Sequence, residues 1–578
     1  MKKTGAQLAV FALEQLGVQF TFGIPGTHTT ELYDEMNKSE QITPILVTHE
    51  VGGAFMADAI SRTSQSIGVI TIVPAAGLTH AMSGIGEAFL DGIPMLVISG
   101  GTHRTSGKSY QLHQFDQLTL AKSITKAQFL IEKQEDVIST IYKAYEIATS
   151  GEPGPVFIEL PINLQLFADT VTEMPKYTPA TRDYSPNPEL INKALEVIKS
   201  AKNPMLFVGW GAVDAVDETI ELAELLVAPV STTLQGKSAF PNNHPLYTSV
   251  GLGASSKPSA QWALAQHDVL IAVGNRFGEI ATGSYGLEPP KNLIHIDINS
   301  EVFDKNFPTT VSIEADSKLA LKAILEGLKS YGYSTSRSFN DISTKLQLEN
   351  KKYLETWLKK PQNNIVSPGH FFTKLRSLLN NDAMMVVDDG KHTFLASELF
   401  PVFNPRSFIS PTDFNCMGYC VPASIATKMA NPNKQVVAIV GDGAFQMTGL
   451  EAITAAAYNI PVIFFIFNDG ELGQISQFQK IPLNRKTCSI IGKANFEGVA
   501  IATGADYLTI DNDNEIEDRI NQALKITEGG KHVIVDIHID YSQKTMLTKG
   551  VVKSNLSRFP FKEKVRFLSR AAKRHLLG

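Results

Sequence analysis

Two aspartates could together hold one hard cation, because each follows a strand-like run at the end of which ligands commonly bind. Asp442 lies in a Gly-Asp-Gly turn after one apolar run, and Asp469 follows the next apolar run along the chain. The carboxyl ends of parallel strands meet at one edge of an open α/β sheet. Magnesium prefers oxygen ligands and usually carries substrate or cofactor phosphates as well. The sequence therefore predicts a magnesium site at Asp442 and Asp469, completed by a backbone carbonyl near Glu471.

The turn around Asp442 is also suited to an anion. Gly441 and Gly443 let the backbone approach a bound group closely. The helix that is expected to start after Ala444 offers its free N–H groups to a phosphate. A lone Gly-Asp-Gly turn is common, but a second oxygen ligand after the adjacent strand makes the pattern specific. We therefore expect a metal ion and a phosphate group to share this site.

Residues 434–473 resemble the signature segment of the thiamine diphosphate-dependent decarboxylase and acetolactate synthase superfamily. The resemblance implies that thiamine diphosphate binds here through Mg²⁺. The second metal ligand of that family is usually asparagine, whereas Asp469 is similar to the aspartate of its flavin-free catabolic acetolactate synthases. Segments 389–392 and 415–418 resemble the family segments that contact the diphosphate and cradle the cofactor rings. The cofactor-binding residues that the resemblance implies are Pro25, Gly26, Gly390, Lys391, His392, Asn415, Met417, Gly441, Asp442, Gly443, Ala444 and Asp469.

Activation of that cofactor requires a carboxyl group, and Glu50 is the candidate. It follows a strand-like segment and precedes a helix; taken alone, a glutamate there is more often a first-turn charge that complements the helix dipole. The upstream Gly-Ile-Pro-Gly turn at 23–26 makes this segment similar to that of the family. The resemblance implies that Glu50 shares a proton with the cofactor's pyrimidine ring, and that Met417 forces the cofactor into its bent shape. Burial raises the pKa of a carboxyl group, so such a group can share a proton near neutral pH.

The sequence indicates the cofactor more clearly than it indicates which reaction follows decarboxylation. His113 occupies a place near the family's reacting centre and could act as an acid or base around neutral pH. Phe478 keeps an aromatic ring where acetolactate synthases line their second-substrate site, while His80 replaces a family asparagine and could serve as a helix cap. Two hypotheses stay open. One is decarboxylation of a pyruvate-like 2-oxo acid followed by carboligation to an acetohydroxy acid such as 2-acetolactate; the other is a 2-oxo acid decarboxylase that releases an aldehyde.

A third hypothesis is a flavin-dependent enzyme similar to pyruvate oxidase. The middle of the chain resembles the family domain that holds flavin adenine dinucleotide (FAD) in some members. The flavin-contacting segments are altered here, to Gly251–Ala254 and Arg276–Glu279. We therefore expect a degenerate or empty flavin site rather than bound FAD. A fourth hypothesis, a non-catalytic thiamine-binding protein, is disfavoured because Glu50 and both metal carboxylates are retained.

Strand-like runs alternate with helical patterns along most of the chain, which predicts the α/β class. The runs are Ile67–Val73, Pro94–Ser99, Pro155–Leu160, Pro204–Val208, Val269–Val273, Val436–Val440 and Val462–Phe467. They are apolar on both faces, which suits parallel strands buried between helices. A chain of 578 residues is too long for one core. We expect three domains, each a mostly parallel sheet flanked by helices. The expected limits are 1–175 (pyrimidine-binding, with Glu50), 185–335 (central, Rossmann-like), 336–365 (linker), 366–553 (diphosphate- and magnesium-binding) and 554–578 (basic tail).

Composition and charge limit the classes of partner and the compartment that we expect for this chain. The net charge of −6 argues against a general nucleic-acid binder. The 3 cysteines cannot form a disulfide framework, so a reducing cytoplasm is expected. The resemblance implies 2-oxo acids as substrates and a homodimer or homotetramer, because in the family the glutamate-bearing domain of one subunit faces the diphosphate domain of another.

The basic tail could form an amphipathic helix. Its apolar residues Phe561, Val565, Leu568, Ala572 and Leu576 recur at helical spacing among lysines and arginines. Such a helix can lie on an anionic membrane surface. We favour the alternative, in which the tail docks on its own subunit or closes over the active site.

Overall fold

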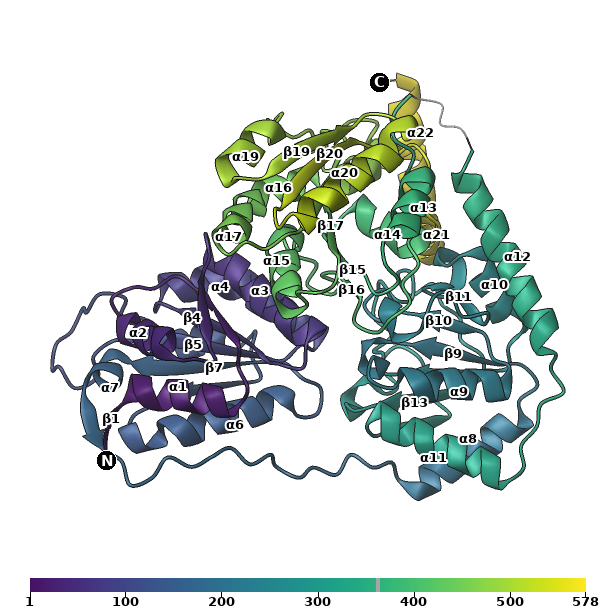
Figure 1. Cartoon of the computed structure of the whole chain (residues 1–578). Coiled ribbons are helices and arrows are strands. Elements are labelled where there is room, and N and C mark those ends of the chain that lie inside the picture. The colour runs from purple at the N-terminus through teal and green to yellow at the C-terminus, as the bar shows by residue number, and fades with distance from the viewer. Residues whose placement is uncertain (360–363, 578) are drawn as a thin grey trace.

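The computed structural model describes residues 1–359 and 364–577, which form three α/β units (Figure 1). The N-terminal sheet has the order β3-β2-β4-β5-β7-β6, and every neighbouring pair is parallel. Its strands are β2 (Phe20–Gly23), β3 (Thr43–Leu46), β4 (Gly68–Ile72), β5 (Met95–Gly101), β6 (Ala127–Leu130) and β7 (Pro155–Pro161). Its helices are α1 (Gly5–Gln15), α2 (Thr30–Lys38), α3 (Glu50–Thr63), α4 (Ala76–Asp91), α5 (Gln117–Ala121), α6 (Val137–Thr149) and α7 (Ile162–Leu166). A short antiparallel ribbon joins β1 (Lys2–Thr4) to β8 (Ala168–Thr170).

A long extended segment crosses from this unit to the central one (Figure 1). The central sheet is also parallel, with the order β11-β10-β9-β12-β13-β14. Its strands are β9 (Pro204–Val208), β10 (Val230–Thr232), β11 (Tyr247–Val250), β12 (Val269–Val273), β13 (Asn292–Asp297) and β14 (Val311–Glu314). Its helices are α8 (Pro188–Ser200), α9 (Val216–Leu226), α10 (Pro258–Gln266), α11 (Ser317–Ser330) and α12 (Phe339–Trp357).

The C-terminal sheet repeats the pattern with the order β16-β15-β17-β18-β20-β19. Its strands are β15 (Met384–Val387), β16 (Phe408–Ile409), β17 (Val436–Gly441), β18 (Ile463–Asn468), β19 (Asp506–Ile510) and β20 (Val533–His538). Its helices are α13 (Pro368–Leu378), α14 (Lys391–Leu399), α15 (Cys420–Ala430), α16 (Asp442–Thr448), α17 (Ala452–Ala457), α18 (Gly473–Leu483), α19 (Phe496–Thr503), α20 (Ile516–Glu528), α21 (Met546–Arg558) and α22 (Phe561–Leu577). The α/β class with three parallel sheets is therefore confirmed.

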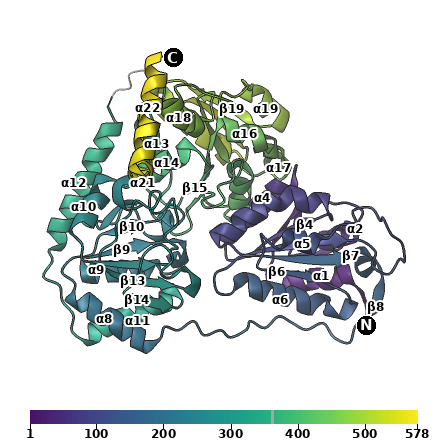
Figure 2. The same cartoon turned by 180° about the vertical axis from the view of Figure 1, so that it is seen from behind.

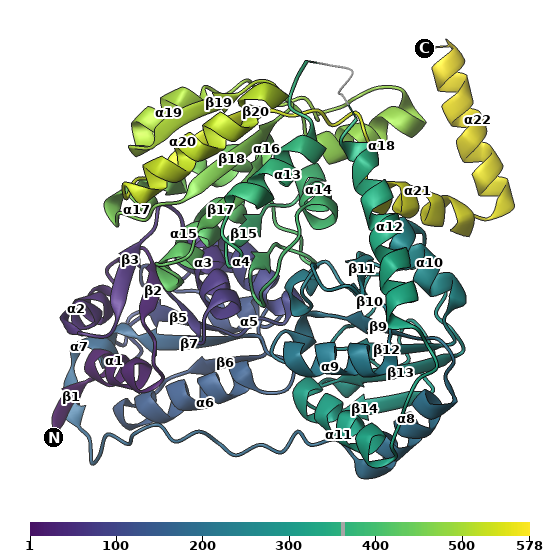
Figure 3. The same cartoon turned by 45° about the vertical axis from the view of Figure 1, so that its right-hand side comes forward.

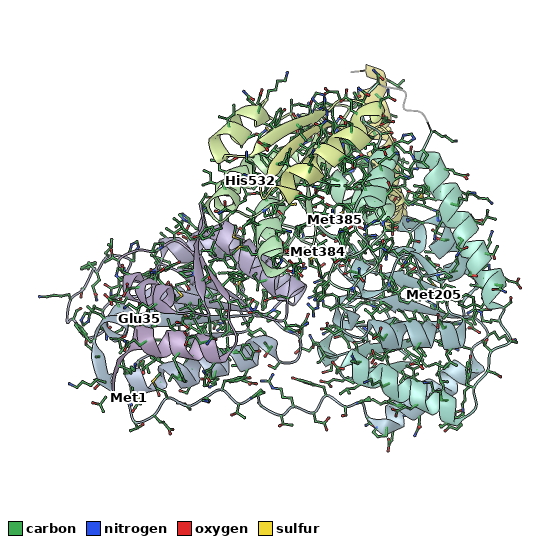
Figure 4. All side chains as sticks on the ribbon, in the orientation of Figure 1. Met1, Glu35, Met205, Met384, Met385 and His532 are labelled. Carbon is green, nitrogen blue, oxygen red and sulfur yellow. The ribbon has the colours of Figure 1, made fainter. Side chains whose placement is uncertain are left out.

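Buried apolar strands explain why helices cover both faces of each sheet. Met384 and Met385 are consecutive residues of β15 and lie in the interior (Figure 4). Since side chains alternate along a strand, Met384 packs into the core shared with α3 and α4 of the N-terminal unit, and Met385 into the core on the opposite face. The contact between α3 and α15 thus ties the N-terminal and C-terminal units together.

The sheets lie inside the domain limits expected from the sequence, and we propose those limits as boundaries. Most of the expected linker is the helix α12, which packs against α10; residues 360–363 lie outside the described chain. Within residues 1–359 and 364–577, no helix has both the length and the apolar character to cross a bilayer.

The tail forms the helix α22, which stands beside the body of the molecule (Figures 2 and 3). It contacts α18, and Phe567 faces that body. The expected apolar face does not pack there, because Phe561 and Leu576 are 83% and 82% exposed. The docked arrangement therefore uses the other side of the helix.

Candidate active site

Loops that follow five strands of the C-terminal sheet meet at its carboxyl edge. They enclose a cavity of about 120 Å³. Ten of the residues expected to bind the cofactor or metal line it: Gly390, Lys391, His392, Met417, Gly441, Asp442, Gly443, Ala444, Asp469 and Glu471. They come together because parallel strands place all their carboxyl ends on one edge of the sheet.

Asp442 and Asp469 follow the adjacent strands β17 and β18, as expected. Asp442 is buried and accepts hydrogen bonds from the backbone N–H groups of Gly443 (2.9 Å) and Gly470 (2.7 Å). Burial raises the pKa of Asp442 to about 6 and also raises that of Asp469. Lys391 Nζ lies 3.3 Å from Asp469 Oδ2 and is the one cation in hydrogen-bond contact with either carboxylate among the described residues. A buried and a half-buried carboxylate with one neighbouring cation keep a net negative charge, so the donor set fits Mg²⁺.

Glu471 lies in the same cavity lining, but its side chain turns to Lys486. Partial burial raises the pKa of Glu471, but its hydrogen bonds with Lys486 and Ser476 and the nearby charges of Lys486 and Lys391 together outweigh that effect and leave the pKa below its ordinary value. The carboxylate is therefore paired with Lys486, and the backbone carbonyl expected near Glu471 stays a prediction.

Beside the aspartates, two glycines lie against the ring of a histidine, and we call Gly390, Gly441 and His392 the cradle. A Cβ atom at Gly390 or Gly441 would lie only 2.6 or 2.9 Å from Cε1 of His392, and Gly390 has φ +149°, which side-chain-bearing residues rarely adopt. Nε2 of His392 is buried without a hydrogen-bond partner in the described chain, and burial lowers its pKa to about 3. A buried nitrogen without a partner next to bare backbone marks a place for a bound group, and a diphosphate oxygen accepts from Nε2 when the neutral imidazole carries its proton there.

Asn415 and Met417 lie on the loop that follows β16. Asn415 has φ +65° and its side chain bonds to Asp389, whereas Met417 lines the metal cavity and also a second cavity between the N-terminal and C-terminal units. Asn415 is not among the residues that line the metal cavity. Met417 is therefore the one predicted ring-contacting residue that reaches both cavities.

Glu50 lies at the carboxyl edge of the N-terminal sheet, as the first residue of α3. Its side chain is buried, and Oε2 lies 3.0 Å from Nδ1 of His80. His80, which could have been a helix cap, caps none: α4 begins after Ala75 and has no side-chain cap. His80 lies in the second turn of α4 and reaches Glu50 at the start of α3, a contact that the linear spacing of the two residues could not show.

Pro25 and Gly26 follow β2 on the same edge. Gly26 packs so closely on Val73 that a Cβ atom would lie 2.5 Å from Cγ1 of that side chain. Thr29 accepts a hydrogen bond from the N–H of Gly26 and fixes the turn. Both residues thus belong to the edge that carries Glu50 rather than to the metal cavity.

His113 lies in the irregular segment after β5, with φ +62°. Its ring meets that of His28 edge-on, with the centroids 5.4 Å apart. Burial and the neighbouring His113 lower the pKa of His28, whose Nδ1 has no hydrogen-bond partner in the described chain. Our sequence reasoning gave no role to His28; its position two residues after Gly26 was the available signal.

The two edges do not share one cavity within the chain. Of the described residues that line the metal cavity, none belongs to the N-terminal unit. A second cavity of about 620 Å³ lies beside Glu50, and His49, His80, Met417, Met447 and Leu450 are among its lining residues. It is walled by both units.

A third cavity, of about 100 Å³, lies where the central unit meets the other two, at the edge where the flavin is expected. Asp91, Glu152, Asp297 and Asp413 line it, with Arg276 as the one cation in the described lining. Burial raises the pKa of Asp297 to about 7. Arg276 is already paired with Glu152 and Asp413. This carboxylate-rich lining does not fit the diphosphate of FAD, because like charges repel.

Three family models match the chain. They are described as thiamine pyrophosphate enzyme, N-terminal TPP binding domain (residues 3–120), central domain (residues 191–324) and C-terminal TPP binding domain (residues 388–537).

Among similar proteins, the acetolactate synthase large subunit of Haemophilus influenzae is 31% identical over 563 residues, which is 94% of this chain and 96% of that protein. The probable acetolactate synthase large subunit of Methanocaldococcus jannaschii is 32% identical, over 93% of this chain and 92% of its own length. The isozyme 3 large subunit of Escherichia coli is 30% identical, over 93% and 95%.

Proposed function

Because this chain belongs to the thiamine diphosphate enzymes of the acetolactate synthase large-subunit type, we propose that it decarboxylates pyruvate and joins the remaining two carbons to a second 2-oxo acid. The product is an acetohydroxy acid such as 2-acetolactate. The observation that carries this proposal is similarity to acetolactate synthases along the whole chain, combined with a cavity that presents Asp442, Asp469 and the cradle on one sheet edge.

Residues at the carboxyl edges of the C-terminal and N-terminal sheets would have different roles. Asp442, Asp469 and a carbonyl near Glu471 would hold Mg²⁺, while Lys391 and His392 would contact the diphosphate. Bound thiamine diphosphate supplies the electron sink that loss of carbon dioxide requires. Glu50, whose carboxyl is buried at the other edge, would hold the proton that it shares with the cofactor's pyrimidine ring. His113 and His28 are candidates for moving protons on the substrate.

The alternatives are not favoured. A decarboxylase that releases an aldehyde has no support among the similar proteins described above, all of which are named acetolactate synthases. A flavin-dependent oxidase is disfavoured by the carboxylates around the central cavity.

The product formed from pyruvate as sole substrate tests the proposal. With thiamine diphosphate and Mg²⁺ present, we expect 2-acetolactate, detected as acetoin after acid treatment, together with one carbon dioxide per two pyruvates consumed. Acetaldehyde and carbon dioxide without acetoin would contradict carboligation. Mixed incubations with 2-oxobutyrate then define the acceptor.

We further propose that two copies pair so that Glu50 of one faces the metal cavity of the other. Separation of Glu50 from the metal cavity within one chain supports this arrangement. Large apolar side chains are exposed at this cavity and just after it along the chain: Met447 (62%) and Leu450 (57%) line the second cavity, and Ile453 (43%) follows in α17. Exposed apolar side chains that gather in this way mark protein interfaces. A homodimer is the minimum assembly, and a homotetramer is compatible with it.

Leu450→Asp is expected to turn the dimer into a monomer and to abolish acetolactate formation. The substitution would bury a carboxylate without a partner at the interface, which strongly disfavours association. Light scattering after size-exclusion chromatography measures the assembly. Leu568→Asp is the control, because Leu568 is exposed to a similar degree (51%) but lies on α22. Dimeric Leu450→Asp with full activity would rule out this interface.

Other partners and the compartment are also proposals. Since the relatives are named large subunits, a smaller partner chain is a candidate. All 3 cysteines of the described chain are free, which is compatible with a reducing cytoplasm. The exposed residues of α22 leave membrane contact as a less favoured alternative.

A further inference from the structure

The carboxyl edge of the N-terminal sheet brings two histidines to the activating glutamate. His49, Glu50 and His80 each offer one ligand atom, and these atoms lie within 4.8 Å of one another. The ring centroids of His49 and His80 are 4.7 Å apart. Two imidazoles and one carboxylate are a donor set that zinc takes at enzyme sites, with a fourth position left for water. We propose that these three residues form a zinc site that excludes the cofactor from Glu50.

His80 distinguishes this chain from the family pattern, which has asparagine at that position. An imidazole suits zinc, whereas an amide oxygen suits harder ions. The histidine therefore completes a zinc-binding set with His49 around the glutamate to which the resemblance assigns activation. His80 caps no helix, so helix capping does not explain an imidazole at this position.

The spacing requires only small movements. Ligand atoms around tetrahedral zinc, at roughly 2.0–2.2 Å from the metal, lie about 3.4 Å from one another. Nδ1 of His80 and Oε2 of Glu50 are 3.0 Å apart, so this pair already has the needed separation. The side chain of His80 is 51% exposed and that of His49 is also exposed, so both rings can turn without disturbing the core.

Zinc ligation breaks two existing hydrogen bonds. Nδ1 of His49 accepts a hydrogen bond from the N–H of Val51 and caps α3. Ligation by His49 removes that cap, because a metal-bound neutral imidazole carries its proton on the other nitrogen. The hydrogen bond between Nδ1 of His80 and Oε2 of Glu50 is also lost, because both atoms would bind the metal. The lost hydrogen bonds are weak compared with the bonds of zinc to its ligands.

The consequence for the enzyme rests on the proposed function, but zinc binding itself does not. A carboxylate that ligates zinc cannot share a proton with the pyrimidine ring. Zinc and thiamine diphosphate would therefore exclude each other at Glu50, and zinc would inhibit loading of the apoenzyme.

Zinc uptake by the full-length apoenzyme tests the site. The protein is titrated with Zn²⁺ in competition with a chromophoric chelator, in excess Mg²⁺ so that the site at Asp442 is occupied. Wild type is expected to bind one more zinc per chain than His80→Asn. With Co²⁺ in place of zinc, wild type is expected to show the visible absorption of a tetrahedral site, and the variant to lack it. Prior addition of thiamine diphosphate is expected to remove the same equivalent.

His538→Asn is the matched control. Nδ1 of His538 lies 2.9 Å from Asp511, and both side chains are 53% exposed, so it is a histidine–carboxylate pair like that of His80 and Glu50. This variant is expected to bind zinc as wild type does. His49→Asn removes a second ligand and is expected to match His80→Asn. Equal zinc uptake by wild type and either folded cluster variant, verified by circular dichroism, overturns the site. If His80→Asn lowers zinc uptake but prior addition of thiamine diphosphate does not, the proposal that zinc and the cofactor exclude each other is overturned. That result also counts against the proposed role of Glu50.

Discussion

Glu50→Gln is expected to lower the turnover number by about 10²–10⁴-fold, the usual contribution of a positioned acid or base, while thiamine diphosphate still binds. Glutamine keeps the size and the hydrogen-bond acceptor of the side chain but cannot exchange a proton with the pyrimidine ring. The metal and diphosphate contacts lie in the other cavity and are untouched. Acetolactate formation gives the rate, and isothermal titration calorimetry gives cofactor affinity. A second readout is hydrogen–deuterium exchange at the reactive carbon of the bound cofactor, which is expected to slow with turnover.

The control separates proton sharing from a helix-dipole effect. Glu189 is also a first-turn glutamate, at the start of α8, and is exposed. If Glu50 only complemented the dipole of α3, Glu50→Gln would lower the free energy of unfolding by roughly 0.3–1 kcal/mol, as is expected for Glu189→Gln. Turnover would then stay intact. Near-normal turnover of Glu50→Gln would refute the activating role.

Asp442→Ala is expected to abolish Mg²⁺-dependent cofactor binding. The substitution removes the more deeply buried carboxylate of the pair and leaves the N–H of Gly470 without its acceptor. Losing one partner of a buried ionic contact costs about 3–5 kcal/mol, which is roughly a hundredfold or more in Kd. The freed loop also carries Asp469, so the second ligand is misplaced as well. Calorimetric titration of thiamine diphosphate at fixed Mg²⁺ measures the effect.

Asp469→Asn is the matched comparison. It keeps an oxygen at the position where the family usually has asparagine, so binding is expected to persist with a smaller loss. The pairing of Lys391 with residue 469 also changes, because the amide removes the opposing charge. Undiminished cofactor binding by Asp442→Ala would rule out the metal assignment, whereas equal losses in both variants would mean that charge matters more than oxygen donation.

Prediction from the sequence succeeded where local pattern and sheet geometry agree. Asp442, Asp469 and Gly390 each follow a buried strand, and parallel strands place their carboxyl ends on one edge regardless of the loops between them. The contacts of His80 and His28 were harder to predict, because His28 lies in a turn and His80 lies on the helix α4, and each side chain meets a residue from another segment of the chain. His80 also stood where a helix cap was a plausible explanation, and only its contact with Glu50 shows otherwise.

The sequence by itself determined the α/β class and the three parallel sheets, because apolar runs buried on both faces are local signals, and its resemblance to a known family implied the cofactor. Its motifs also nominated Glu50 and the metal aspartates. Only the tertiary structure decided that Glu50 and the metal cavity lie apart within one chain, that His80 rather than a cap residue meets Glu50, and that carboxylates line the cavity of the central unit. These are relations between side chains far apart in sequence. They depend on how loops pack at sheet edges and on which faces two units share, and no periodicity along the chain encodes them.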